Sequence, residues 1–187
     1  MKKYVLLSVL LVSFATVAEG QKPYRLKSHK MTIDGTSSMH DWTSDVTKLE
    51  WTGVVLTEGN TVKEIKNVVV KIPVVSIKST KGKTMDNKTY DAFKSDKNPT
   101  ITYKLNGVAV NGSNIQATGS LTMAGNTKTI VIPATAKVLA NGDVQISGNQ
   151  KLNMKDYKMT PPTALMGSIK VGEEIMVKYD LTLTPSN

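Results

Sequence analysis

A strict alternation of apolar and polar residues near the end of the chain constrains the fold more than any other feature. Between Glu174 and Leu183, every second position is apolar: Ile175, Val177, Tyr179, Leu181 and Leu183. Successive side chains of a β-strand point to opposite faces, so this spacing puts all five on one face. The segment is therefore predicted to be a strand with one buried face.

The same two-residue period recurs along the chain, which predicts an all-β fold. It groups Ile101, Tyr103 and Leu105 on one face, and Ile115, Ala117, Gly119, Leu121 and Met123 on another. Runs with a less definite register cover 49–56, 64–77, 129–138, 144–152 and 168–171. The turn sequences between runs are Glu58-Gly59-Asn60, Asn106-Gly107, Asn111-Gly112, Gly125-Asn126 and Asn141-Gly142-Asp143. About eight antiparallel strands form a barrel or a sandwich, and a closed barrel is favoured because it has no bare edges.

Helical periodicity is weak, and only short helices are expected. A helix is favoured at 86–93, because Met85 just before it, Thr89 and Phe93 are spaced four residues apart. Residues 38–42 could form one turn capped by serine, and residues 161–167 could start on their prolines and end at glycine. These segments are expected to lie across the ends of the barrel.

The first twenty residues are expected to be a secretory signal peptide. Two lysines follow Met1, an apolar stretch covers 4–18, and Ala18-Glu19-Gly20 supplies the small residues of a cleavage site near Gly20. A retained anchor is the alternative. Cleavage would leave one domain, 21–187, in the periplasm or outside the cell, with no later apolar run long enough to span a membrane. The chain has no cysteine, which excludes disulfides, cysteine metal sites and cysteine nucleophiles.

The charge balance points to an anionic environment but not to nucleic acid. The chain has a formal charge of +9, and losing Lys2, Lys3 and Glu19 with the signal would leave 9 − 2 + 1 = +8. Lysines are spread along the chain and Arg25 is its sole arginine. Nucleic-acid-binding proteins usually cluster basic residues with stacking aromatics, so a solvated basic surface facing anionic lipid or cell-wall polymers is favoured.

Catalytic chemistry finds little support in the sequence. The two histidines, His29 and His40, lie in separate segments. His40 and Asp41 follow Ser37 and Ser38, but a catalytic triad is assembled by the fold rather than by adjacency. Two dispersed histidines also fall short of a metal site. The protein is therefore expected not to be an enzyme and to need no cofactor or metal.

The apolar content is rich in methionine and aliphatic residues, with nine methionines and two phenylalanines. Flexible methionines suit a pocket for a long apolar chain, and they equally suit an ordinary core. The candidates are Met85, Met123, Met154, Met159, Met166 and Met176. Periodicity leaves open whether the barrel is filled or hollow.

Four stretches, in order, resemble the YceI-like polyisoprenoid-binding family. They are Gly-Thr-Ser-Ser-Met-His-Asp-Trp-Thr at 35–43, the segments 74–79 and 98–103 with Met85 and Phe93 between them, Gly-Ser-Leu-Thr-Met-Ala-Gly-Asn-Thr-Lys at 119–128, and Leu-Asn-Met-Lys-Asp-Tyr at 152–157. The resemblance implies an extended, lipocalin-like antiparallel barrel that holds an isoprenoid chain. The chain departs from the family pattern at His40-Asp41-Trp42, where other members carry His-Ser, and at Met154 and Lys158, where many carry Arg and Gly.

We therefore expect an exported, non-enzymatic protein that sequesters or transports an isoprenoid or other apolar lipid. Ligand-binding side chains are predicted inside the barrel at Val70, Ile72, Phe93, Ile101, Tyr103, Leu121, Met123, Val177, Tyr179 and Leu181. Trp42, His40 and Tyr157 are predicted at a polar mouth. The alternative is a structural or stress-response module with a filled barrel that acts through its basic surface. A homodimer is left open.

Overall fold

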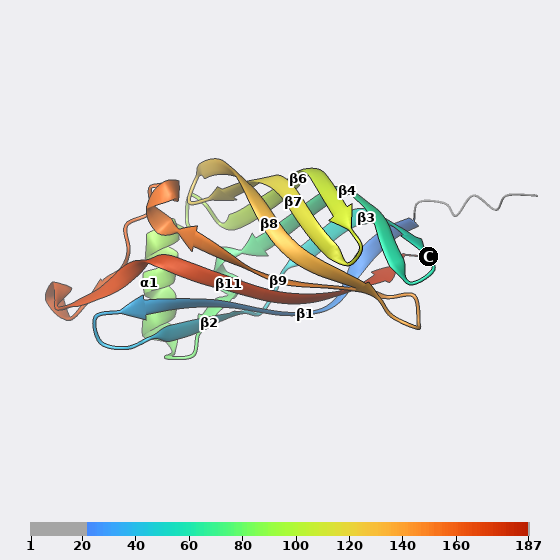
Figure 1. The fold of residues 1–187 in the computed structure, drawn as a ribbon. Coiled ribbons are helices and arrows are strands. Elements are labelled where there is room, and N and C mark those ends of the chain that lie inside the picture. Colours follow the sequence, from blue (N-terminus) through green and yellow to red (C-terminus); the bar gives the residue numbers. More distant parts are fainter. Residues whose placement is uncertain (1–21, 187) are drawn as a thin grey trace, which may run out of the picture.

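The computed structural model describes residues 22–186, and Figure 1 shows strands that wrap around one another along an extended axis. The strands are β1 (Lys22–Ser37), β2 (Trp42–Val46), β3 (Glu50–Glu58), β4 (Thr61–Pro73), β5 (Ile77–Ser79), β6 (Thr100–Asn111), β7 (Asn114–Met123), β8 (Asn126–Val138), β9 (Val144–Asn153), β10 (Thr163–Ala164) and β11 (Ile169–Pro185). The helix α1 covers Lys83–Phe93. Three short 3-10 turns cover Val74–Ser76, Met154–Tyr157 and Leu165–Gly167. The signal peptide predicted at 1–20 lies outside the described residues.

Eight of these strands close into an antiparallel barrel. Neighbours pair in the order β1-β3-β4-β6-β7-β8-β9-β11, and β11 pairs with β1 to complete the ring. The closing ladder runs from the pair Tyr24 and Pro185 to the pair Ser37 and Val171. The predicted barrel architecture is therefore confirmed. The pairing of β11 with β1 leaves no bare edge around the ring.

The long strand β1 changes partners along its length, which shapes one end of the barrel. Its first residues, 22–25, pair with β3, whereas 32–35 pair with β2. The strand β2 pairs in turn with β5, so the sheet continues beyond the ring at this end. Figure 1 shows α1 standing across the same end. No helix within 22–186 is long and apolar enough to cross a membrane.

Four of the five predicted turns connect neighbouring strands, and one does not. The turns at 58–60, 111–112, 125–126 and 141–143 lie at hairpin connections. The Asn106-Gly107 pair instead lies inside β6, where the register with β7 shifts between Leu105 and Gly107. A bulge uses the same residue types as a tight turn, which explains why the sequence signal was misread.

The predicted helices are partly confirmed. The helix α1 begins three residues before the predicted start and ends at Phe93 as expected. Residues 38–41 form a bend rather than a helical turn, because the Ser37 hydroxyl accepts the N–H groups of Met39 and His40 and the chain then enters β2. After the prolines at 161–162 the chain is extended at β10, and only Leu165–Gly167 forms a 3-10 turn.

Candidate functional site

A central cavity of about 190 Å³ lies inside the barrel. All ten side chains predicted to point inward line it: Val70, Ile72, Phe93, Ile101, Tyr103, Leu121, Met123, Val177, Tyr179 and Leu181. The register explains this arrangement, because Val70 lies opposite Tyr103 and Ile72 lies opposite Ile101 on neighbouring strands. Their part in ligand binding remains a prediction.

The cavity also has lining residues that the sequence analysis did not single out. They include Met31, Ile33, Trp51, Ile65, Ile130, Ile132 and Ile146. A partial signal existed on β8, where Ile130, Ile132 and Ala134 are spaced two residues apart, but Val131 between the first two is also apolar. On β1 the signal was weaker, because Met31 and Ile33 follow an irregularity between Leu26 and Ser28.

Two tyrosines enter the cavity wall without offering it a free polar atom. The Tyr103 hydroxyl donates to the Ala117 carbonyl oxygen at 3.0 Å, and the Tyr179 hydroxyl donates to the Pro133 carbonyl oxygen at 3.0 Å. Burial raises the pKa of each to about 12, so both phenols are neutral at physiological pH. With their hydroxyls satisfied, the rings present carbon to the interior.

Glycines on the adjacent, hydrogen-bonded strands make room for these rings. A β carbon on Gly119 would come 2.5 Å from the Lys104 carbonyl oxygen, and one on Gly148 would come 2.7 Å from that of Pro133. Both hypothetical atoms would also collide with the tyrosine ring that lies over the glycine. The absence of a side chain at these two positions therefore sets where the rings can lie.

The sequence left open whether the barrel is filled or hollow. The central cavity shows that it is hollow. An apolar cavity of about 150 Å³ can bind benzene, and typical small-molecule pockets hold about 300–1,000 Å³. At about 190 Å³ the central cavity accommodates a short apolar segment in this conformation. A longer chain would have to extend beyond it.

A second cavity of about 60 Å³ lies between α1 and the adjacent end of the barrel. The helix contributes Met85, Lys88, Thr89, Ala92 and Phe93 to its lining. Four side chains border both cavities, and we call them the partition: Ile33, Phe93, Met123 and Ile175. The two spaces are thus separated by a single layer of flexible or apolar side chains.

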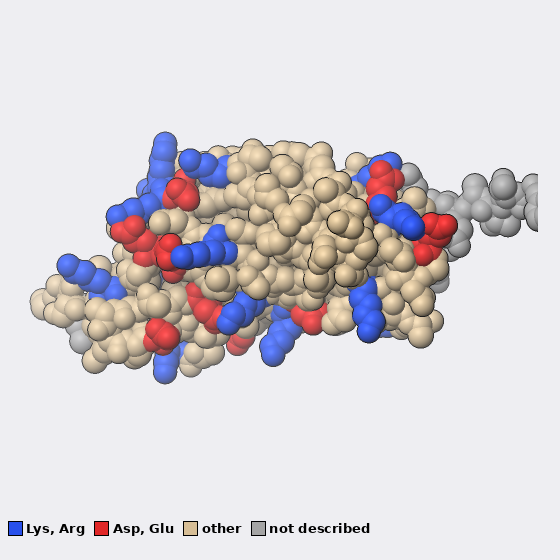
Figure 2. All heavy atoms as spheres, in the orientation of Figure 1, with Lys and Arg blue, Asp and Glu red and all other residues tan. Residues whose placement is uncertain are grey.

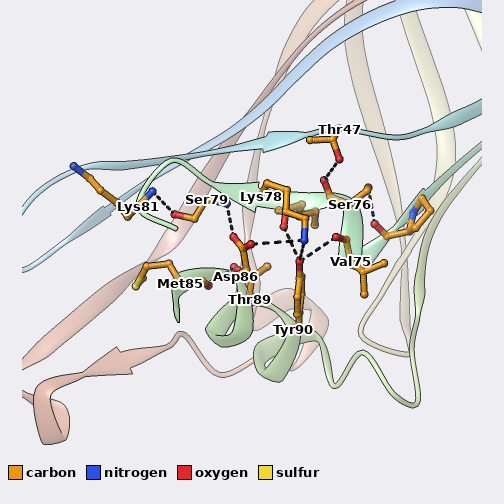
Figure 3. Close-up of polar contacts among 12 residues, drawn as sticks. Thr47, Val75, Ser76, Lys78, Ser79, Lys81, Met85, Asp86, Thr89 and Tyr90 are labelled. Carbon is orange, nitrogen blue, oxygen red and sulfur yellow. Dashed lines mark hydrogen bonds and ion pairs between the residues drawn. The ribbon is translucent and has the colours of Figure 1, made fainter. Parts of the chain in front are cut away.

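Polar contacts fix one side of α1 to β5 and the turn before it, as Figure 3 shows. The Asp86 carboxylate accepts the Ser79 N–H at 2.6 Å and lies 3.7 Å from the Lys78 ammonium. The Tyr90 hydroxyl accepts from Lys78 at 2.6 Å and donates to the Val75 carbonyl oxygen at 3.0 Å. An adjacent face of α1 lines the second cavity, so these contacts hold the helix against the barrel end.

The three residues predicted at a polar mouth lie in three different environments. Trp42 lines the second cavity, and its indole N–H donates to the Thr36 carbonyl oxygen at 3.0 Å. His40 is exposed and lines neither cavity, with its Nδ1 3.0 Å from the Asp41 carbonyl oxygen. Its predicted place at a mouth is corrected, because the bend at 38–41 turns it toward solvent.

Tyr157 requires the opposite correction, because it is buried rather than at a mouth. Its side chain is 1% exposed, and it lies in the 3-10 turn Met154–Tyr157, which packs into the core with Met154 and Met159. Burial raises the pKa of its phenol, followed in importance by the nearby Asp156 charge. Among residues 22–186 its hydroxyl finds no hydrogen-bond partner.

The six methionines proposed as pocket fillers divide by position. Met123 borders both cavities, and Met85, Met154 and Met159 line the second. Met166 is fully exposed and Met176 lines neither cavity. Sequence alone could not separate these groups, because methionine has no strong preference between core and pocket lining.

The serine and histidine near 37–41 are not arranged as a catalytic triad. The Ser37 hydroxyl donates to the His40 carbonyl oxygen at 2.7 Å, whereas the His40 ring faces a backbone oxygen. The other histidine, His29, has its Nε2 3.0 Å from the Val46 carbonyl oxygen. Within the part of the chain that the structure describes, no three histidine or acidic side chains gather to hold a metal ion.

On the face that Figure 2 presents, basic side chains lie toward both ends and the lower edge rather than in one patch. Figure 2 shows lysines interspersed with acidic residues on the face it presents. Several are paired, including Lys151 with Glu174 at 2.7 Å and Lys178 with Asp34 at 2.9 Å. This distribution fits a solvated surface better than a nucleic-acid interface.

The sequence matches the YceI-like domain family over residues 21–183. Among solved structures, BcnA of Burkholderia cenocepacia has a TM-score of 0.66 at 18% identity, covering 83% of this chain and 96% of that one. A polyisoprenoid binding domain from Saccharophagus degradans, implicated in plant cell wall breakdown, has a TM-score of 0.68 at 14% identity, covering 87% and 98%. A Campylobacter jejuni YCEI protein has a TM-score of 0.56 at 20% identity, covering 100% and 99%. No curated protein matched the chain.

Proposed function

Because the chain belongs to the YceI-like family, we propose that it binds a lipid with an isoprenoid or similar apolar chain inside its barrel. The observation that carries this proposal is the central cavity, which is walled almost entirely by carbon. The similar Saccharophagus degradans structure, described as a polyisoprenoid binding domain, supports the same ligand class.

Burial of the chain supplies the binding free energy. Each CH₂ removed from water contributes about 0.8 kcal/mol, so a short run of isoprene carbons is held without a dedicated polar contact. The hydroxyls of Tyr103 and Tyr179 already have partners, so an apolar occupant leaves neither unsatisfied. Discrimination inside the barrel then rests on shape and length.

The physiological role we propose is sequestration or transport outside the cytoplasm, without catalysis. The signal-like sequence at 1–20 supports export. The backbone contacts of the two histidines support a non-enzymatic role, because neither histidine is placed beside a nucleophile and an orienting carboxylate. The competing proposal is a module that acts through its basic surface. It predicts that the protein functions without any ligand in the barrel.

Native mass spectrometry of the protein purified from its own host tests these proposals. We expect one apolar lipid per chain, identified after organic extraction, and the same spectra report whether the protein is a monomer or a homodimer. Protein that arrives empty and stays empty when isoprenoids are offered would overturn lipid binding. That result would favour the surface-acting module.

A further inference from the structure

The second cavity differs chemically from the central one, although only the partition separates them. Among the residues that line the central cavity, the side chains with nitrogen or oxygen atoms are Trp51, Gln150 and the two tyrosines with satisfied hydroxyls. The second cavity has Ser44, Ser79, Lys88 and Thr89 in its wall. Within the described lining of both cavities, Lys88 is the sole charged side chain.

The Lys88 ammonium can donate more hydrogen bonds than the one it makes. Its Nζ donates to the Thr163 carbonyl oxygen at 2.6 Å, which uses one of three N–H donors. In the part of the chain that the structure describes, no ion pair engages Lys88. Of the acidic residues on the same helix, Asp86 is bound to the Ser79 amide and Lys78, and no ion pair among the described residues joins Asp91 to Lys88. The Lys88 side chain is half-buried, and its ammonium, whose bond to Thr163 lies at the surface, is complementary to an anionic group.

We propose that the second cavity binds the anionic head group of a lipid, a phosphate or carboxylate next to Lys88, while the tail passes the partition into the central cavity. This inference rests on the proposed lipid-binding function. The space of about 60 Å³ is several times the ~15 Å³ that one water requires, which suits a small head group. The ligand anion accepts from the Lys88 donors that the Thr163 carbonyl leaves free.

The geometry also defines the route of entry. Thr163 belongs to β10, a two-residue strand held by β11, and the adjoining Pro162 carbonyl accepts the Val171 N–H at 3.1 Å. The Lys88 contact is the hydrogen bond that ties α1 to this short segment. Because the bond between Lys88 and Thr163 lies at the surface, this side of the second cavity is where a lipid would enter.

The test compares two probes with the same tail, farnesyl phosphate and farnesol, titrated into delipidated full-length protein. We expect the wild type to prefer the phosphate, and Lys88→Gln to weaken phosphate binding about tenfold while leaving farnesol unchanged. Lys88→Arg keeps the charge and should retain the preference. Lys83→Gln, at an exposed position on the same helix, is the matched control and should change neither affinity.

The outcomes separate this inference from the function on which it rests. If wild-type protein binds neither probe, lipid binding itself fails. If farnesol binds but the phosphate gives no advantage, or Lys88→Gln weakens both probes equally, the head-group assignment is wrong. Inorganic phosphate is the third arm, and binding as tight as that of farnesyl phosphate would also overturn the assignment, because the site would then not depend on a tail.

Discussion

The Tyr179 ring lies directly over Gly148 on the neighbouring strand, and its hydroxyl reaches past the glycine to the Pro133 carbonyl oxygen at 3.0 Å. A methyl group at Gly148 would come 2.9 Å from Tyr179 Cζ and 2.7 Å from that backbone oxygen. The ring cannot move outward through the sheet, so it would have to tilt into the cavity.

Gly148→Ala should therefore destabilise the barrel and shrink its cavity together. Overpacking of this kind costs about 1–3 kcal/mol, which thermal unfolding would measure, and farnesol binding should weaken. Gly107→Ala is the control, because a β carbon there meets nothing within 4 Å. Equal unfolding temperatures for the two variants would contradict the packing described for Tyr179.

The partition should limit the length of chain that the barrel accepts. Phe93→Ala removes the ring that borders both cavities and should raise the affinity for geranylgeraniol relative to farnesol. The same substitution should lower the free energy of unfolding by about 3–5 kcal/mol. Ile115→Ala enlarges the central cavity without touching the partition, so it should leave that ratio unchanged. If the Phe93 variant does not fold, Phe93→Leu offers a milder version, and an unchanged ratio there would refute the role of the partition.

The inward face of the barrel could be predicted because a period of two assigns faces directly. Once Ile101 and Tyr103 were placed on one face, antiparallel pairing carried Val70 and Ile72 to the same side. The same rule failed at Asn106, where one extra residue forms a bulge whose sequence looks like a turn. The alternation of apolar and polar residues thus predicts regular strand pairing well but does not predict bulges.

The second cavity could not be predicted, because its walls come from elements far apart in the chain. Trp42, Met85 and Val171 lie on β2, α1 and β11. The sequence signal on 86–93 indicated a helix but not what its face would cover. Tyr157 was misplaced for a related reason, since the direction of a side chain on a 3-10 turn depends on the surrounding packing.

The attachment of α1 should depend on Asp86. Asp86→Ala leaves the Ser79 N–H without its acceptor and removes the ion pair with Lys78, and it should cost about 2 kcal/mol. Hydrogen exchange should show faster exchange of α1 amides while the amides of β7 and β8 stay protected. Asp91→Ala, at an exposed position on the same helix, should leave both measurements unchanged. Uniform loss of protection across barrel and helix would contradict a local role.

Two tyrosine hydroxyls should respond to removal with opposite signs. Tyr157→Phe deletes a buried hydroxyl that no described residue satisfies and should stabilise the protein by about 1 kcal/mol. Tyr103→Phe deletes a bond to the Ala117 carbonyl oxygen and should destabilise it by about 1 kcal/mol. Chemical denaturation of both variants measures the difference, and a loss of stability in Tyr157→Phe would show that its hydroxyl has a partner.

At the β8–β9 turn, Asp143 should make stability depend on pH. Its carboxylate lies 2.6 Å from the Lys27 ammonium and accepts the Asn141 amide at 2.9 Å, and its side chain is 4% exposed. The hydrogen bond from Lys27, followed by those from Thr184 and Asn141, holds the pKa of Asp143 below its ordinary value. Its contribution is therefore present above the unfolded pKa of about 3.9 and is lost as the pH falls through the lowered folded pKa.

Thermal unfolding of the wild type and Asp143→Asn between pH 2 and pH 7 should show this dependence. The unfolding temperatures should differ by a constant amount above about pH 5 and converge below about pH 4, because protonation of Asp143 weakens the same contact that the asparagine variant lacks. High salt should narrow the gap near neutral pH, since the Lys27 side chain is half exposed. A gap that persists undiminished to pH 2 would show that the carboxylate contributes through shape rather than charge.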